Sequence, residues 1–263
     1  MSQNKREKIF SHLNEFFDKI YVITLKRSKA RHASIKHSLK GLDYEIYWAV
    51  DGMKLDRKQL EKEGVYSSEG ARRAKAEMKA QPGEMTMGAI GCALSHIGIL
   101  EETLEQNYQN VLILEDDISV NEESADTLVN ALEELPPDWE LFYLGYLFNN
   151  NSMSFSSYLR QYLAYPILKL TGIERYDPHV FRCKFPRDYS DHLDRSGFHY
   201  GCHAYGVTPE GARKLIESQK PLVREIDILY GLMCQYEEVK AFNVKERVFH
   251  QNREDFPSTI DGT

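Results

Sequence analysis

The sequence predicts an α/β fold in which a parallel or mixed β-sheet is flanked by helices. Short apolar runs rich in β-branched and aromatic residues alternate along the chain with segments that have helical spacing. The run at residues 111–114 is continuously apolar, as expected of a strand that is covered on both faces. The chain has 263 residues, 42% hydrophobic and 28% charged, which is ordinary globular composition and enough to bury a sizeable core.

The chain opens with a predicted strand, helix and strand. Residues 19–25 have the composition of a first strand, and Ser28 stands where it would cap a helix that runs to about residue 41. Residues 44–50 predict a second strand, and Asp51-Gly52 after it is a strong turn signal.

Residues 53–87 are charged and poor in large apolar side chains, so we expect a flexible or lid-like segment. A helix over residues 88–106 then leads into the strand at residue 111. Its apolar residues recur at helical spacing: Ile90, Leu94, Ile97, Leu100 and Leu104.

The second half continues the alternation. We expect a helix over residues 124–135, stopped by Pro136-Pro137, and a buried strand over residues 141–147. Residues 149–200 have no regular pattern and predict an irregular insertion beside the site.

The remaining elements are shorter. Residues 204–207 predict a strand, Pro209 suits the first position of a helix ending near residue 218, and residues 226–233 suit another helix. A strand is expected within residues 239–248, and residues from about 250 onward predict an extended, flexible tail.

Three adjacent acids, Glu115, Asp116 and Asp117, follow the apolar strand at residue 111. Ligands of α/β sheets gather outside the carboxyl ends of the strands. Because extended side chains alternate, Glu115 and Asp117 should point to one side and Asp116 to the other. The pair suits Mg²⁺ or Mn²⁺, which prefer carboxylate oxygens and often also bind substrate phosphates. The alternative is a solvated turn that leads into the next helix.

The charge and the cysteines narrow the class of protein. A net charge of -7 argues against broad nucleic-acid binding, which needs a basic surface. The polar opening contains no apolar run long enough for a signal peptide or membrane span, so a cytoplasmic protein is expected. The four cysteines lack CxxC spacing and are predicted to be free thiols, not zinc ligands.

Several motifs, in this order and spacing, resemble glycosyltransferase family 25, which includes bacterial lipooligosaccharide galactosyltransferases and collagen galactosyltransferases. The resemblance implies a single GT-A-like (Rossmann-like) domain over residues 1–263 and a nucleotide-sugar donor, usually a UDP-sugar. It also implies inversion at the anomeric carbon and a role in cell-surface glycan synthesis, of the lipopolysaccharide type, with galactose or glucose transferred. The matching segments are residues 21–28 with Arg31, 49–52, 91–96, 112–117, 203–205, 211–212 and 226–227.

The same resemblance suggests how a metal would be held. Glu115 and Asp117 are expected to bind Mn²⁺ or Mg²⁺, and His250 is the late-chain histidine that would complete the coordination. Asp116 would contact the ribose or sugar of the donor, or else accept backbone hydrogen bonds. An ordinary surface role for His250 stays open.

Other residues are predicted to surround the donor. Thr24, Leu25 and Asp51, at the ends of the first two strands, should flank the nucleoside. Two arginines, Arg27 and Arg31, are four residues apart, so one helical face would present both guanidinium groups to a diphosphate. A solvated basic face is the alternative.

Two further groups of residues complete the prediction. Ser95 and His96 are placed near the donor by resemblance, although a histidine buried in the core is the alternative. An inverting displacement needs a general base, for which Asp227 is the candidate and Glu225 the alternate. Apolar neighbours around Asp227 should raise its pKa, while a helix-capping role is the competing interpretation.

Two other functions use the same residues. A nucleotidyl- or phosphoryl-transfer enzyme would also hold Mg²⁺ with these acids, although no GxxxxGK[ST] loop is present. A catalytically silent nucleotide-sugar-binding protein is the third possibility.

The insertion at residues 149–200 has a slight basic excess and many aromatic side chains. It is predicted to dock an anionic lipid-linked acceptor or to make a peripheral contact with the membrane, with its aromatic side chains stacked on sugar, although a purely structural role fits equally well. The acceptor expected for the whole protein is a saccharide or a lipid-linked saccharide. Its basic residues are Arg160, Lys169, Arg175, Arg182, Lys184, Arg187 and Arg195, and its acids are Glu174, Asp177, Asp188, Asp191 and Asp194.

Overall fold

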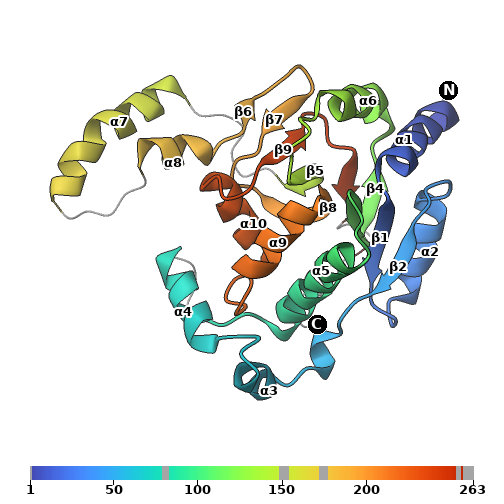
Figure 1. The fold of residues 1–263 in the computed structure, drawn as a ribbon, viewed down its shortest axis with the longest axis horizontal. Coiled ribbons are helices and arrows are strands. Elements are labelled where there is room, and N and C mark those ends of the chain that lie inside the picture. Colours follow the sequence, from blue (N-terminus) through green and yellow to red (C-terminus); the bar gives the residue numbers. More distant parts are fainter. Residues whose placement is uncertain (1, 79–82, 148–153, 172–176, 253–255, 257–263) are drawn as a thin grey trace.

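A computed structural model describes residues 2–78, 83–147, 154–171, 177–252 and 256, and it shows a mixed eight-stranded sheet between two layers of helices (Figure 1). The strand order is β2-β1-β3-β8-β5-β9-β7-β6, and β10 and β4 form a separate pair. The predicted fold class, a mixed α/β sheet flanked by helices, is therefore confirmed. The strands are β1 (Lys19–Thr24), β2 (Glu45–Trp48), β3 (Val111–Glu115), β4 (Ile118–Val120), β5 (Leu141–Leu147), β6 (Arg187–Asp188), β7 (Leu193–Arg195), β8 (Tyr200–Val207), β9 (Ala241–Val244) and β10 (Phe249–Gln251).

The pairing of the first three strands brings their carboxyl ends to one edge of the sheet. Strand β1 is parallel to both β2 and β3, with Ile23 opposite Glu115 and Thr24 opposite Trp48. Strand β8 runs antiparallel between β3 and β5, and β9 is parallel to β5. Residues that follow β1, β2 and β3 therefore meet above the same edge.

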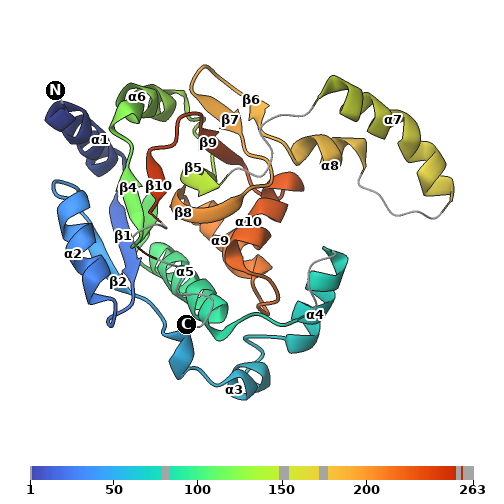
Figure 2. The ribbon, with the colours of Figure 1, turned by 180° about the vertical axis from the view of Figure 1, so that it is seen from behind.

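Helices cover the two faces of the sheet (Figures 1 and 2). Because side chains alternate along β1, Ile20 and Val22 pack in the core cluster with α1, α2 and α6, and Tyr21 and Ile23 pack with α5, α9 and α10. The helices are α1 (Ser2–Phe16), α2 (Lys29–Ser38), η1 (Gly52–Lys54), α3 (Arg57–Lys62), α4 (Ser68–Glu77), α5 (Met87–Glu105), η2 (Glu122–Ser124), α6 (Ala125–Glu134), α7 (Phe155–Leu170), α8 (Pro178–Cys183), α9 (Pro209–Ser218) and α10 (Ile226–Gln235).

Most predicted elements are confirmed with shifts of a few residues at their ends. The five predicted strands with clear apolar runs correspond to β1, β2, β3, β5 and β8, and the expected strand near the C-terminus is β9. The predicted helices correspond to α2, α5, α6, α9 and α10. Ser28 is the N-cap residue of α2, and Pro209 is the first residue of α9.

The prediction of a lid-like segment over residues 53–87 is wrong for the part that the structure describes. Helices α3 and α4 begin at the capping side chains of Asp56 and Ser67, which accept backbone hydrogen bonds. Tyr66, Ala71 and other residues of this segment pack with α5 in a third core cluster. Small alanines can be buried close to a neighbouring helix, so few large apolar residues were needed. Residues 79–82 lie outside the described residues.

The prediction of irregular structure over residues 149–200 is also wrong where the chain is described. Helices α7 and α8 extend from one end of the sheet (Figures 1 and 2), and β7 pairs with β9 and so belongs to the main sheet. Four apolar side chains of α7 are strongly exposed, namely Phe155, Leu163, Ile167 and Leu170. Residues 148–153 and 172–176 lie outside the described part of the chain.

Both ends of the chain contain elements that we did not predict. Helix α1 buries Ile9, Phe10 and Leu13 in the main core. Near the C-terminus, β10 pairs antiparallel with β4, with His250 opposite Ser119, so residues 249–251 are not an extended tail. The rest of the predicted tail, apart from residues 252 and 256, is not described. Among the residues that the structure does describe, no helix is both long enough and apolar enough to cross a membrane.

Candidate active site

A cavity opens at the carboxyl ends of β1 and β3, with a volume of about 820 Å³ including space open to solvent. We call it the strand-end pocket. Glu225, Asp227 and His250 are not among its lining residues, but all the other predicted site residues are. These are Thr24, Leu25, Arg27, Arg31, Asp51, Ser95, His96, Glu115, Asp116 and Asp117.

Asp116 is fixed by two neighbouring elements. The Thr24 hydroxyl donates a hydrogen bond of 2.5 Å to Asp116 Oδ2, and the buried Arg31 guanidinium donates to Oδ1. Arg31 Nη1 also lies 3.8 Å from Asp117 Oδ2. Thr24 and Asp116 therefore join the ends of β1 and β3, and Arg31 neutralises part of the acidic cluster.

Glu115 and Asp117 both lie near the Gln251 side chain, although β3 ends at Glu115 and Asp117 belongs to the turn that follows, so strand alternation is not what places Asp117. Gln251 Nε2 lies 3.5 Å from Glu115 Oε2 and 3.2 Å from Asp117 Oδ2. The other carboxylate oxygen of Asp117, Oδ1, is buried and has no hydrogen-bond partner among the described residues. Asp116 faces Thr24 and Arg31 instead.

The electrostatics of these acids favour a bound cation. Burial, followed by the charges of Asp117 and Asp116, raises the pKa of Glu115 to about 8. Burial also raises the pKa of Asp117, although Arg31 opposes that shift. Within the described residues, the ion pairs of this three-acid cluster involve one guanidinium, that of Arg31, which contacts Asp116 and Asp117. The oxygens of Glu115 and Asp117 therefore fit a hard divalent ion such as Mg²⁺ or Mn²⁺.

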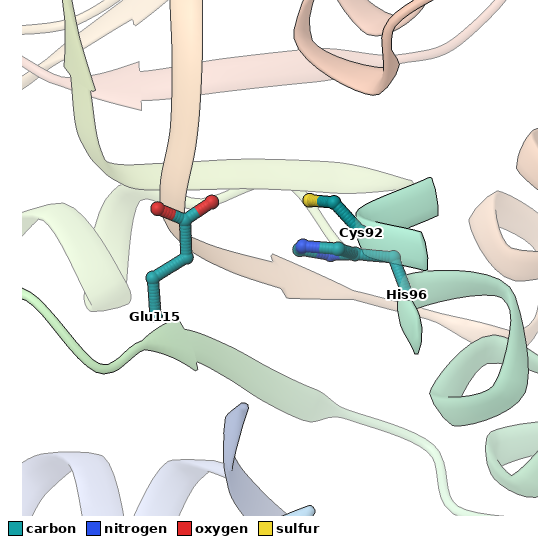
Figure 3. Close-up of side chains that lie close together, drawn as sticks. All are labelled: Cys92, His96 and Glu115. Atoms are coloured by element: carbon teal, nitrogen blue, oxygen red, sulfur yellow. The ribbon is translucent and has the colours of Figure 1, made fainter. Parts of the chain in front are cut away.

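Helix α5 supplies the opposite wall of the pocket. Figure 3 shows Cys92 and His96 extending from this helix toward Glu115, and their ligand atoms all lie within 4.8 Å of one another. The His96 Nδ1 atom is 2.8 Å from the Tyr205 hydroxyl, whereas the buried Nε2 has no partner among the described residues. Burial lowers the pKa of His96 to about 3, so the ring is neutral and its Nε2 faces the acids.

Cys92 was not among the predicted site residues. Burial raises the pKa of its thiol well above the ordinary value, so without a metal it is protonated. All four cysteines are free thiols, as predicted. A thiol, an imidazole and a carboxylate together are typical ligands of a softer ion such as Zn²⁺, so the expectation that no cysteine binds zinc stays a prediction.

Ser95 positions the turn after β2. Its hydroxyl accepts a hydrogen bond of 2.8 Å from Val50 N and donates one of 2.6 Å to Gly91 O. A Cβ atom at Gly91 would lie 2.6 Å from Val50 O, so only glycine allows this approach. A Cβ atom at Gly52 would lie 2.0 Å from Met87 O. The two predicted motifs that contain these glycines are therefore packed against each other.

The two arginines do not share a helical face as predicted. Helix α2 begins at Lys29, so Arg27 lies in the preceding turn, where it forms an ion pair with Asp51. Arg31 is buried and forms an ion pair with Asp116. The arginines therefore hold two separate acids at the pocket, and their contact with a diphosphate stays a prediction.

Asp227 lies in the first turn of α10, next to the acidic cluster. Gly201 N donates 3.2 Å to its Oδ2, and Ile228 N donates 2.8 Å to its Oδ1. Burial raises the pKa of Asp227, and its charge contributes to the raised pKa of Glu115. The N-cap residue of α10 is Glu225, and its side chain pairs with Lys75 at 3.3 Å instead of capping the helix.

His250 is half-buried in β10 and does not line the strand-end pocket. Its neighbour Gln251 contacts the acids, and side chains alternate along a strand, so the structure does not bring His250 to Glu115 and Asp117. The metal-binding role of His250 stays a prediction. Gln251 was missed because residues 249–251 were predicted to begin a tail and not a strand.

Comparison with known proteins places the chain in a family. Residues 17–230 match the family described as glycosyltransferase family 25 (LPS biosynthesis protein). A glycosyltransferase 25 family member of Anopheles gambiae is 31% identical over 204 residues, which cover 76% of this chain and 28% of that protein. Procollagen galactosyltransferase 1 of Danio rerio is 30% identical over 225 residues, covering 84% of this chain and 32% of that protein.

Procollagen galactosyltransferase 2 of Mus musculus is 31% identical over 134 residues, which cover 49% of this chain and 21% of that protein. The chain thus spans a third or less of the length of these relatives. Among solved structures, mouse xyloside xylosyltransferase 1 matches with 7% identity and a TM-score of 0.31, over 97% of this chain and 75% of that chain. That score is too low to bear on the fold.

A mixed α/β sheet that presents an acid-lined pocket at its strand ends is the architecture of many nucleotide-binding enzymes. The match over residues 17–230 is more specific, and the chain belongs to glycosyltransferase family 25.

Proposed function

We propose that this protein is a metal-dependent inverting glycosyltransferase that moves a hexose from a UDP-sugar to a saccharide acceptor. The observation that carries the proposal is the pair Glu115 and Asp117, whose oxygens converge in the strand-end pocket of a family 25 chain. The acidic excess there favours a cation, and nucleotide diphosphates commonly bind together with Mg²⁺ or Mn²⁺.

The strand-end pocket suits the donor. Its lining combines backbone and side-chain polar groups from the ends of β1, β2 and β3 with side chains of α5. Thr24, Leu25 and Asp51 line the pocket at the end of β1 and after β2, and the nucleoside is proposed to bind against them. The metal, held by Glu115 and Asp117, would act as a Lewis acid toward the diphosphate leaving group.

Asp227 is the proposed general base. It would accept the proton of the acceptor hydroxyl as the new bond to the anomeric carbon forms and the bond to the diphosphate breaks. The raised pKa of Asp227 increases its basicity relative to an ordinary carboxylate. Glu225 is the alternate base, but its carboxylate is already paired with Lys75.

The names of the relatives and of the family support a proposal for the transferred sugar and the pathway. Galactose is favoured because the names of several relatives specify galactosyltransferases, and glucose is the second candidate. The description of the family supports a role in lipopolysaccharide synthesis. A cytoplasmic location, with peripheral membrane contact to reach a lipid-linked acceptor, completes the proposal. The exposed apolar side chains of α7 support that contact.

A panel of nucleotide sugars tests the proposal. Purified protein is incubated with UDP-galactose, UDP-glucose and other nucleotide sugars plus Mn²⁺, with and without EDTA, and released UDP and glycosylated product are measured. We expect one UDP-hexose to give UDP release, and we expect EDTA to abolish that release. Release of pyrophosphate instead would indicate nucleotidyl transfer. Binding of UDP-hexose without turnover against a broad panel of saccharide acceptors would indicate a silent binding protein.

A further inference from the structure

A second cavity lies between α4 and α10, beside the first residue of β8. Its volume is about 890 Å³ including space open to solvent. We call it the α4–α10 groove. The side chains that matter for its chemistry are Lys75, Met78, Tyr200, Arg224, Glu225 and Ile228.

Asp227 lies next to residues of both the α4–α10 groove and the strand-end pocket. The two backbone groups that donate to its carboxylate belong to Gly201, which follows Tyr200, and to Ile228, which lines the groove. Asp227 is also close enough to Glu115 and Cys92, which line the strand-end pocket, for its charge to raise their pKa values. A molecule in the groove would therefore lie next to residues that hold the Asp227 carboxylate.

The charged groups of the groove are already balanced. Lys75 Nζ lies 3.3 Å from Glu225 Oε1 and donates 3.0 Å to Glu84 O, and Arg224 Nη2 lies 2.6 Å from Glu77 Oε2. Since Lys75 and Arg224 each have an acidic partner, the described part of the groove lining offers no unpaired positive charge to an anionic group. Paired carboxylate and ammonium groups still accept and donate hydrogen bonds to hydroxyls.

The remaining walls are apolar and aromatic. Tyr200 is 38% exposed, and its ring meets Phe198 in an edge-to-face contact with centroids 5.2 Å apart. Met78 and Ile228 add half-buried apolar surface. An aromatic face beside apolar side chains and a few hydrogen-bonding groups suits a ligand that has both C–H faces and hydroxyls.

We infer that the α4–α10 groove binds the acceptor as a neutral pyranose, with Tyr200 against one face of the sugar ring and the Lys75–Glu225 pair on its hydroxyls. The inference rests on the proposed function, because it makes Asp227 the point where acceptor and donor meet. It assigns acceptor binding to Tyr200, which ends the region predicted as an insertion, and to α4, which lies in the segment predicted to be lid-like.

Saturation-transfer NMR tests the inference without requiring turnover. The probes are methyl β-galactopyranoside, methyl β-glucopyranoside and methyl N-acetyl-β-glucosaminide, each added with UDP and the diamagnetic ion Mg²⁺ to the full chain. The variants are Tyr200→Ala and Tyr200→Phe. The control is Tyr236→Ala, which removes another exposed tyrosine that lines neither cavity.

We expect saturation transfer to the ring protons of at least one glycoside in the parent protein. The signal should fall at least threefold in Tyr200→Ala and persist in Tyr200→Phe and Tyr236→Ala, while UDP signals stay the same in all four proteins. The inference would be overturned if Tyr200→Ala and the parent gave equal glycoside signals, or if the parent gave none. In either case, UDP signals in the same samples would still support the proposed function. Failure of UDP to bind would defeat both.

Discussion

The strand-end pocket and the α4–α10 groove differ in how their charged side chains are paired. The pocket concentrates Glu115, Asp116 and Asp117 around a single arginine, whereas the groove pairs each cation with its own acid. An uncompensated acidic cluster needs a cation, and a balanced surface with an exposed tyrosine suits a neutral ligand. The difference matches the two substrates of a glycosyl transfer: a charged donor and an uncharged hydroxyl compound.

The two cavities also differ in how the chain builds them. The strand-end pocket uses turns directly after parallel strands, together with one helix packed closely against them by Gly52 and Gly91. The groove uses side chains from two helices that are far apart in the sequence. Asp227 lines neither cavity. Its carboxylate accepts a hydrogen bond from Gly201, next to the groove residue Tyr200, and its charge contributes to the raised pKa of Glu115 in the strand-end pocket. The following predictions test this division.

The largest effect is expected at the acidic cluster. Asp117→Ala removes one of the two carboxylates proposed to hold the metal, so the rate of UDP-hexose turnover should fall by about 10³-fold. Turnover is measured by UDP release at saturating Mn²⁺. The control Asp126→Ala removes an exposed acid of α6 paired with Lys8, and its rate should match the parent. An unchanged rate in Asp117→Ala would remove this residue from the metal site.

The next largest effect distinguishes loss of the general base from loss of donor binding. Asp227→Asn should lower kcat by about 10²-fold, because proton transfer from the acceptor is lost, while UDP affinity measured by calorimetry stays near that of the parent. Glu225→Gln is the comparison, and we expect it to affect kcat much less. If Glu225→Gln instead lowered kcat as strongly as Asp227→Asn, the general base would have to be reassigned.

A smaller effect tests how the strand-end pocket is held together. Ser95→Ala leaves the Val50 N–H without its hydrogen-bond partner, so the free energy of unfolding should fall by about 1–3 kcal/mol in denaturant titrations.

Ser38→Ala is the matched control, since the Ser38 hydroxyl donates to the carbonyl four residues earlier, as Ser95 does, but on α2. It should change the free energy of unfolding by less than about 0.5 kcal/mol. Equal losses in the two variants would mean that the contact with Val50 contributes nothing.

The smallest effect is a pH dependence of stability. The pKa of Glu115 is raised to about 8 from an ordinary 4.5, so between these values the folded protein holds a proton that the unfolded chain has lost. Stability of the metal-free protein should therefore fall as pH rises through this window. Glu115→Gln lacks this loss, so in EDTA its Tm should exceed that of the parent by about 5 °C near pH 8.

Addition of Mn²⁺ should make the Tm of the parent higher than that of Glu115→Gln near pH 8. The metal stabilises the folded parent by binding to Glu115, and it binds glutamine more weakly. The control Glu210→Gln alters an exposed glutamate of α9 and should leave the pH profile of Tm unchanged. Parallel pH profiles for Glu115→Gln and the parent would contradict the raised pKa.

Much of the fold was predictable because local pattern and tertiary environment agree. The apolar run before Glu115 favours a buried strand, and the structure shows that strand with the acids at its carboxyl end. The lid-like prediction failed because composition alone does not reveal that Ala71 and Ala74 are buried against neighbouring elements. The tail prediction failed because β10 is only three residues long and is stabilised by its partner β4.

The sequence by itself determined the class of fold, which follows from periodicity. Its resemblance to a family also predicted most of the residues that line the strand-end pocket, since the matching motifs lie around strand ends and on α5. Only the tertiary structure decided that Gln251 and Cys92 face the acids, that His250 does not, and that Tyr200 shares a groove with α4. The physical reason is that these contacts join segments distant in the chain. Their proximity depends on how whole elements pack, which no local pattern specifies.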